Sequence, residues 1–407
     1  MNVVVGQSGG PTSVINASLA GVYEGALAAG ADKVYGMRNG ILGFLNERLV
    51  LLNDVLDSEK KIETLKRTPA CFLGSCRYKL KKAEQSVAEY EKIFSILQKY
   101  EIDCFLYIGG NDSMDTVAKL SAYGKKIGSN IRFVGVPKTI DNDLPVTDHT
   151  PGYGSAAKFV ATSLKELVCD STIYDVESVT IVEIMGRNAG WLTAASALAK
   201  GADCAGVDMI CLPEVPFTIE GFTDKIAKLL TKKKGLVVAV SEGVKLPDGR
   251  YVCELGANDQ GEDVFGHKQL TGTAAFLANE CANRLHIKTR AIEFSTLQRC
   301  AAHVSSLSDV TEAWQVGAAA ARAAIEGKSG VAATLVRASD TPYRCETGIV
   351  AIEQMANLEK TVPLSWITED GMGLTEEYLA YARPLIQGEL TPFYENGLPC
   401  HLVLEKE

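Results

Sequence analysis

The stretch that decides the fold class is IRFVGVPKTIDND, residues 131–143, in which an apolar run ends abruptly in a polar loop. Residues 103–113, DCFLYIGGNDS, show the same pattern earlier in the chain, an apolar run followed by a polar loop. Both apolar runs are continuous and do not alternate with polar residues, which is typical of parallel strands buried on both faces. They predict an α/β fold in which helices cover a central sheet.

The same pattern recurs along the chain. Further apolar runs predict strands at 3–5, 179–184, 207–212 and 236–240. Helix-like segments lie between the runs, at 13–30, 79–100, 155–168 and 221–234. This alternation of strands and helices favours doubly wound, mostly parallel, Rossmann-like layers.

The length of 407 residues is sufficient for two or three domains. The segment 139–155 is the richest in turn-forming residues and is the candidate domain boundary. We expect a first α/β domain at 1–150, a second at 151–297, and a C-terminal segment at 298–407. The last segment contains an Ala-rich helix at 311–327 and is expected to pack back on both domains.

Composition excludes several classes of protein. The net charge of −9 argues against bulk binding to nucleic acid or to a membrane surface. No uncharged apolar run is long enough to span a membrane. The eleven cysteines lack zinc-finger or CxxC spacing, and no secretion signal precedes the first strand. We therefore expect reduced thiols in a cytoplasmic protein.

Ligands of open α/β sheets bind beyond the carboxyl ends of the strands, so the loops there are the candidate sites. Gly9 and Gly10 follow the first strand and would let backbone N–H groups approach an anion, although a purely structural turn fits equally well. Arg77 opens a cationic stretch that could bind phosphate or could simply be a solvated helix start.

The loop after the strand at 103–108 combines glycines with an amide, a carboxylate and a hydroxyl. These groups belong to Gly110, Asn111, Asp112 and Ser113. They could serve a Mg²⁺–phosphate site, or Asp112 and Ser113 could be helix caps.

Lys138, Asp141 and Asp143 follow the strand at 131–136. Two carboxylates beside a lysine favour general-base chemistry on a hydroxyl next to an anionic group. The alternative is an Asx-turn loop without chemistry.

Two further loops carry charged groups. Arg187 lies in a tight turn after the strand at 179–184, where it suits a sugar phosphate. Glu242 follows the strand at 236–240 and could accept hydrogen bonds from sugar hydroxyls or cap a turn. Together the loops indicate phosphoryl transfer onto a hydroxyl, a reaction that depends mainly on positioning and charge neutralisation.

These loops resemble, in order, the motifs of bacterial-type 6-phosphofructokinases. The motifs are GGP from position 9, LGSCR from 73, GGNDS from 109, PKTIDND from 137, MGRNAGWLT from 185, SEG from 241 and TRA from 289. The resemblance covers residues 3–317 and implies an active site in the cleft between two Rossmann-like domains. The first domain would bind the phosphoryl donor and the second fructose 6-phosphate.

The resemblance also implies roles for single residues. Asp141 matches the base that takes the proton of the C1 hydroxyl of fructose 6-phosphate. The remaining positions that match substrate-binding residues are Thr139, Asp143, Met185, Gly186, Arg187, Glu242, Arg290, Thr296 and Arg299. Thr296 stands where the family has a histidine. Arg290 matches an arginine that reaches a neighbouring subunit's site, which implies a homodimer or homotetramer.

The donor side is where this chain departs from ATP-dependent members, which read GGDGS and PGTIDND. Here Asp112 would crowd and repel the α-phosphate of a nucleotide, and Lys138 would supply a cation to diphosphate. This pair resembles the diphosphate-dependent subfamily. The other implied donor-site residues are Gly10, Arg77, Gly110 and Ser113. Asn111 stands at the Mg²⁺-holding position and is the expected metal ligand.

The expected activity is therefore reversible, Mg²⁺-dependent transfer of a phosphoryl group from diphosphate to fructose 6-phosphate. Three alternatives remain: ATP as the donor, a non-catalytic sugar-phosphate sensor, and a dinucleotide-dependent oxidoreductase. The last is disfavoured because the chain lacks GxGxxG with an acidic residue about 20 positions on.

Overall fold

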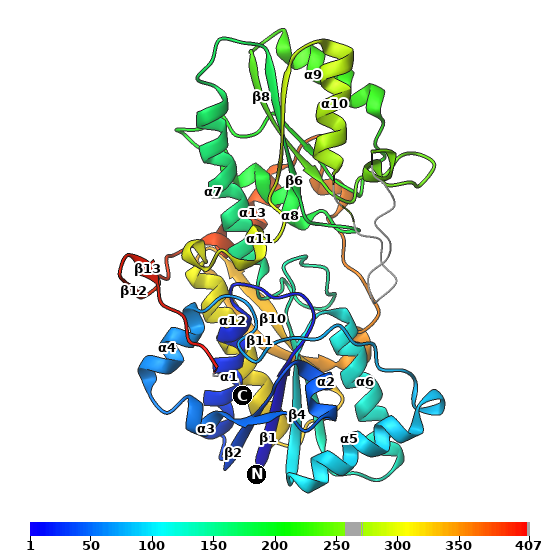
Figure 1. The fold of residues 1–407 in the computed structure, drawn as a ribbon, viewed down its shortest axis with the longest axis vertical. Coiled ribbons are helices and arrows are strands. Elements are labelled where there is room, and N and C mark those ends of the chain that lie inside the picture. Colours follow the sequence, from blue (N-terminus) through cyan, green and yellow to red (C-terminus); the bar gives the residue numbers. More distant parts are fainter. Residues whose placement is uncertain (257–269, 271, 405–407) are drawn as a thin grey trace.

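The computed structural model of the chain describes residues 1–256, 270 and 272–404. Two lobes lie one above the other along the long axis of the molecule (Figure 1), each built on a sheet of its own. The predicted α/β class with two mostly parallel sheets is confirmed. No helix within the described residues is long and apolar enough to cross a membrane.

The lower lobe in Figure 1 contains a seven-stranded sheet in the order β11-β10-β5-β4-β1-β2-β3. Its internal pairs are parallel, whereas β2 with β3 and β10 with β11 are antiparallel. The strands are β1 Asn2–Gln7, β2 Lys33–Met37, β3 Leu49–Leu51, β4 Ile102–Gly109, β5 Arg132–Pro137, β10 Val331–Asp340 and β11 Tyr343–Ala351.

The upper lobe contains a four-stranded sheet in the order β7-β8-β6-β9, with parallel pairs throughout its described strands. The strands are β6 Ser178–Ile184, β7 Met209–Cys211, β8 Gly235–Ser241 and β9 Lys288–Glu293. All six strands expected from apolar runs are present in the two sheets, although β7 is shorter than its run.

Helices cover both sheets, and the segments expected to be helical contain helices with shifted ends. The helices of the lower lobe are α1 Ile15–Ala28, α2 Gly40–Leu45, α3 Leu52–Val55, α4 Glu59–Arg67, α5 Val87–Lys99, α6 Asn111–Lys126 and α12 Leu307–Ile325. Those of the upper lobe and the junction are α7 Tyr153–Ser171, α8 Trp191–Ala194, α9 Ile219–Leu230, α10 Thr273–Leu285, α11 Leu297–Cys300 and α13 Glu376–Ala382.

The Ala-rich helix α12 packs against α1 at very short range. A Cβ atom added at Gly21 of α1 would lie 2.0 Å from the carbonyl oxygen of Trp314, and one at Gly317 would lie 2.2 Å from that of Ser18. Glycine and alanine therefore let the two backbones meet, and the pair covers one face of the seven-stranded sheet.

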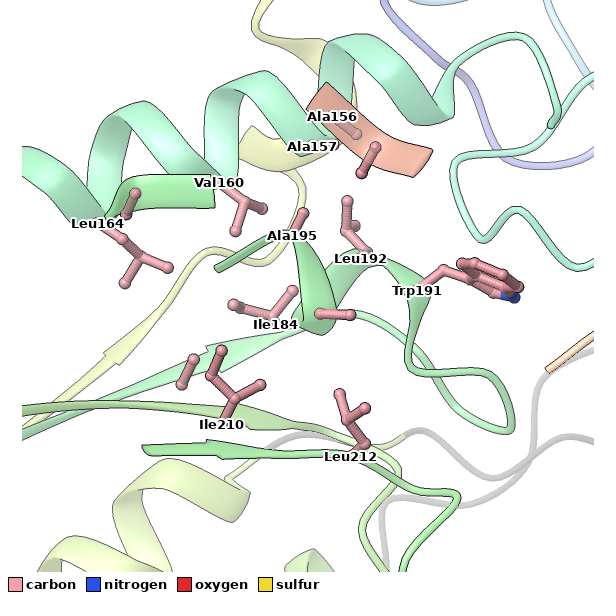
Figure 2. Close-up of a cluster of buried hydrophobic side chains, with 14 of the residues drawn as sticks. Ala156, Ala157, Val160, Leu164, Ile184, Trp191, Leu192, Ala195, Ile210 and Leu212 are labelled. Carbon is pink, nitrogen blue, oxygen red and sulfur yellow. The ribbon is translucent and has the colours of Figure 1, made fainter. Parts of the chain in front are cut away.

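The upper-lobe core holds the carboxyl ends of its strands in place. Figure 2 shows Val160 and Leu164 of α7 above Ile184 of β6, with Ile210 and Leu212 below. All five side chains are buried. Since Ile184 directly precedes the loop that begins at Met185, this packing positions that loop.

The C-terminal region contacts both lobes. Its strands β10 and β11 extend the lower sheet, and its later side chains, including Tyr378 and Leu385, join the upper-lobe core. The domain division at 150 and 297 stays a prediction, because the lower sheet takes strands from both ends of the chain. All eleven cysteines are free thiols.

Candidate active site

A cavity of about 570 Å³ opens where the strand-end loops of the two lobes meet. The loops after β1, β4 and β5 contribute from the lower lobe, and those after β6 and β8 from the upper lobe. Predicted site residues that line it are Gly10, Arg77, Gly110, Asn111, Asp112, Ser113, Lys138, Thr139, Asp141, Asp143, Met185, Arg187, Glu242 and Arg299. They converge because the carboxyl ends of parallel strands share one edge of each sheet.

Lys138 joins the loops that follow β5 and β1. Its side chain is only 3% exposed, and its Nζ donates a hydrogen bond to the carbonyl oxygen of Gly10 at 2.6 Å. Burial lowers the pKa of Lys138, while the Cys71 thiol and the carboxylates of Asp141 and Asp143 act in the opposite direction. Lys138 thus presents a desolvated amino group, a hydrogen-bond donor, to the cavity.

Asp141 is held by its own loop. The Thr139 hydroxyl donates a hydrogen bond to Asp141 Oδ2 at 3.3 Å. It also accepts a hydrogen bond from the backbone N–H of Asp141 at 3.1 Å. Burial raises the pKa of Asp141, and Thr139, Lys138 and Arg187 counteract that rise. A carboxylate with a raised pKa beside cations is well placed to accept a proton.

The loop between Asp141 and Asp143 is fixed by Asn142, whose backbone is left-handed with φ 53°. Its side-chain amide donates to the Tyr381 hydroxyl and accepts the backbone N–H of Thr150. Burial, and then the charges of Asp141 and Glu359, raise the pKa of Asp143 to about 7. The protonation of the Asp143 carboxylate therefore depends on the charge of Asp141.

Glu242 and the turn at Gly186 form the upper-lobe side. Gly186 has φ 146°, which favours glycine, and its N–H donates to Glu242 Oε1 at 3.3 Å. Burial raises the pKa of Glu242 to about 8, although the Gly186 hydrogen bond opposes the rise. Gly186 thus acts on the cavity through Glu242, while Met185 and Arg187 line it directly.

At the start of α6, Gly110 through Ser113 form a tight strand-to-helix turn. A Cβ atom at Gly109 would lie 1.9 Å from the Ser113 hydroxyl oxygen, so only glycine fits there. Asp112 lines the cavity in the first turn of the helix. The side chain of Asn111 binds the backbone of residues 357 and 358 instead of pointing freely into the cavity.

Besides Gly186, two predicted residues do not line this cavity. Thr296 precedes α11 as its N-cap residue and is absent from the described lining. Arg290 lies on β9, pairs with Asp170 at 3.2 Å and lines a separate hollow of about 90 Å³. Neither residue therefore lines the main cavity of its own chain.

Asn357, Leu358 and Glu359 also line the cavity, although the sequence did not predict them as site residues. They come from the C-terminal region, where no motif stands out. His149 was not predicted either, and it is fully buried between Asp148 Oδ2 at 2.8 Å and Glu312 Oε2 at 2.7 Å. A histidine directly after an aspartate, close to the PKTIDND motif, was its only sequence signal.

Comparison with known proteins identifies the family. The Phosphofructokinase family profile matches residues 2–324. The chain belongs to the phosphofructokinase family. Its relatives include the pyrophosphate–fructose 6-phosphate 1-phosphotransferases of Methylococcus capsulatus, 41% identical over 99% of this chain and 96% of the relative, and of Xanthomonas campestris pv. campestris, 42% identical with the same coverage.

A solved phosphofructokinase has the same fold over its whole length. The pyrophosphate-dependent phosphofructokinase of Nitrosospira multiformis is 37% identical, with a TM-score of 0.89 over 100% of this chain and 98% of that chain. The family motifs GGNDS and PKTIDND therefore lie in a phosphofructokinase fold.

Proposed function

We propose that the chain is a diphosphate-dependent 6-phosphofructokinase, which transfers a phosphoryl group reversibly from diphosphate to the C1 hydroxyl of fructose 6-phosphate. The observation that carries the proposal is the position of Lys138 between the Gly10 turn and Asp141, with Asp112 lining the same cavity. The printed names of the relatives from Methylococcus and Xanthomonas support the same donor.

In this reaction Asp141 accepts the proton of the C1 hydroxyl as the hydroxyl oxygen attacks one phosphorus atom of diphosphate. The bond from that phosphorus to the bridging oxygen breaks, and phosphate leaves. Lys138 stabilises the negative charge on the transferred group and on the leaving phosphate. The same groups would serve the reverse reaction. That direction is accessible because diphosphate provides a smaller driving force than ATP.

The sugar phosphate would lie between the upper-lobe loops and the loop that follows β5. Arg187 and Arg299 are the cations that would bind its phosphate, and Glu242 and Asp143 would bind hydroxyls. Met185, Gly186 and Thr139 would shape the pocket. Gly10, Arg77, Gly110 and Ser113 would bind diphosphate from the lower-lobe side.

We infer that Mg²⁺ takes part, as is general in this family. The described residues contain no group of three His, Cys, Asp or Glu side chains able to hold a metal alone. That fits Mg²⁺, which binds through one or two carboxylates plus substrate phosphates. Of the carboxylates that line the cavity, Asp112 and Asp141 are the ones we propose for the ion, which would neutralise charge on the diphosphate.

Arg290 is proposed to complete the site of a neighbouring subunit in a homodimer or homotetramer, because it lies away from the cavity of its own chain. We also propose a cytoplasmic location. Thr296, at the start of α11, is proposed to contribute to substrate binding.

The experiment mixes the protein with fructose 6-phosphate, diphosphate and Mg²⁺ and measures fructose 1,6-bisphosphate. The reverse reaction starts from fructose 1,6-bisphosphate and phosphate. Product in both directions is expected. Binding of fructose 6-phosphate without turnover would instead favour the sensor, and product from ATP alone would favour the ATP-dependent enzyme.

A further inference from the structure

The feature that the family resemblance leaves unexplained is a short strap, residues 357–360, in the C-terminal region. It follows the strand pair β10–β11 and a 3₁₀ turn at Ile352–Gln354, and leads from the lower lobe to the upper one. Asn357, Leu358 and Glu359 of the strap line the main cavity. The strap is therefore one wall of the active site.

Asn111 holds the first half of the strap. Its Nδ2 donates to the carbonyl oxygen of Leu358 at 2.8 Å, and its Oδ1 accepts the backbone N–H of Asn357. Asn357, in the left-handed region with φ 60°, donates from its own amide to Asp115 Oδ1 at 3.0 Å. The strap thus docks on the first turns of α6.

The Asn111 contact needs an amide and not a carboxylate. One half of the side chain donates and the other accepts, so both backbone groups of the strap find a partner. An ionised carboxylate has only acceptors, and one of its oxygens would face the Leu358 carbonyl oxygen. These two hydrogen bonds therefore explain why this chain has asparagine at a position where the family has a metal-binding aspartate.

The second half of the strap is fixed at Lys360. Its backbone N–H donates to the carbonyl oxygen of Asp143 at 2.7 Å, and its carbonyl oxygen accepts Trp191 Nε1 at 2.9 Å. Its Nζ donates to the carbonyl oxygens of Thr147 and Asp148. Glu359 lies between the two anchored ends, on the cavity side.

We infer that Asn111 is a positioning residue that closes the strap 357–360 over the active site, and that it is not a metal ligand. The amide acts through the backbone of Asn357 and Leu358, and so keeps Glu359 beside the cavity that contains Asp141 and Asp143. The kinetic consequence rests on the proposed function, whereas the contact itself does not.

Asn111→Asp separates the two roles, because they predict opposite results. As a positioning residue, Asn111→Asp loosens the strap: amide hydrogen exchange in peptides covering 355–360 rises about tenfold or more, and kcat falls about tenfold. The Mg²⁺ concentration for half-maximal activity stays within about twofold of wild type. If residue 111 were instead a metal ligand, the new carboxylate would lower the Mg²⁺ concentration for half-maximal activity. It would leave amide hydrogen exchange at 355–360 unchanged.

Asn357→Ala opens the strap by a second route that leaves the amide of Asn111 intact, and we expect faster exchange in the same peptides. Asn279→Asp, an exposed change on α10, is the matched control and leaves exchange at 355–360 as in wild type. Unchanged exchange in both strap variants would overturn the inference. Because exchange is measured without substrates, a failed inference is distinguishable from a failed assignment of the donor.

Discussion

The Nζ of Lys138 lies 2.6 Å from the carbonyl oxygen of Gly10, and this hydrogen bond ties the loop after β5 to the loop after β1. The backbone N–H of Lys138 also donates to the carbonyl oxygen of Gly109, at the end of β4. One residue therefore joins three neighbouring strand ends and carries a cation in the cavity. A glycine at this position could keep the backbone contact but would supply no charge.

The cation of Lys138 should matter more to catalysis than to substrate binding. Lys138→Met keeps much of the buried volume and removes the charge, so we expect kcat with diphosphate to fall about 100-fold or more. Steady-state kinetics with Lys328→Met, an exposed lysine, as the control will measure this. A kcat within about threefold of wild type would exclude Lys138 from stabilising the transferred group.

Asp141 is expected to be the proton acceptor. Asp141→Ser keeps a small polar side chain in the Thr139 loop but removes the base, so kcat should drop by roughly 10²–10⁴ with a smaller change in KM. Because burial raises the pKa of Asp141, the acid limb of the wild-type pH–rate profile should lie above that of an ordinary aspartate. A serine variant with more than about a tenth of wild-type kcat would remove Asp141 from this role.

Asp112 is expected to exclude nucleotides. Asp112→Gly removes both its bulk and its charge, so the variant should gain measurable, although weak, ATP-dependent activity. Asp112→Asn removes only the charge and separates repulsion from crowding. Donor preference, measured as the ratio of kcat/KM for the two donors, should shift towards ATP most in the glycine variant. An unchanged ratio in both variants would show that Asp112 does not select the donor.

His149 should make stability depend on pH. Burial alone would lower the pKa of His149, but its hydrogen bonds to Asp148 and Glu312 outweigh burial and raise the pKa to about 9. The stabilisation, about 3 kcal/mol, is complete below the unfolded-state pKa near 6.5. It is lost as pH rises through about 9.

His149→Gln should therefore be less stable than wild type at pH 6, and the difference should shrink towards pH 10. Denaturant unfolding of both proteins across this range gives the two free energies of unfolding. If the difference between them is the same at both ends of the range, the histidine is not a buried cation.

Arg290 is expected to act across a subunit interface. Arg290→Ala should raise KM for fructose 6-phosphate about 10- to 100-fold, because a charge-assisted contact is lost, with little change in KM for diphosphate. Arg284→Ala, an exposed arginine of α10, is the control. Full specific activity in a protein shown by light scattering to be monomeric would contradict the proposed role of Arg290.

How much of this structure follows from the sequence depends on the kind of element. Continuous apolar runs predicted the buried strands such as β4 and β5, because burial on both faces leaves a strong signal. The strand β9 was missed, since its six residues Lys288–Glu293 are largely exposed and charged. The C-terminal strands β10 and β11 were missed as well.

The residues of the candidate site likewise divide into those that the sequence predicts and those that it does not. Lys138 and Asp141 could be found because each follows an apolar strand, and parallel strand ends meet at one edge. Asn357 could not, because its contact with Asn111 joins positions 246 residues apart through backbone groups, which carry no side-chain signature. Buried His149 likewise gains its partner Glu312 only when the C-terminal region folds back.

Donor choice is the central claim, and the most direct measurement is kcat/KM for diphosphate and for ATP at saturating fructose 6-phosphate and Mg²⁺. Lys138 and Asp112 together predict that wild type uses diphosphate with a kcat/KM at least about 100-fold above that for ATP. A wild-type enzyme that prefers ATP, or uses both donors equally, would contradict the account.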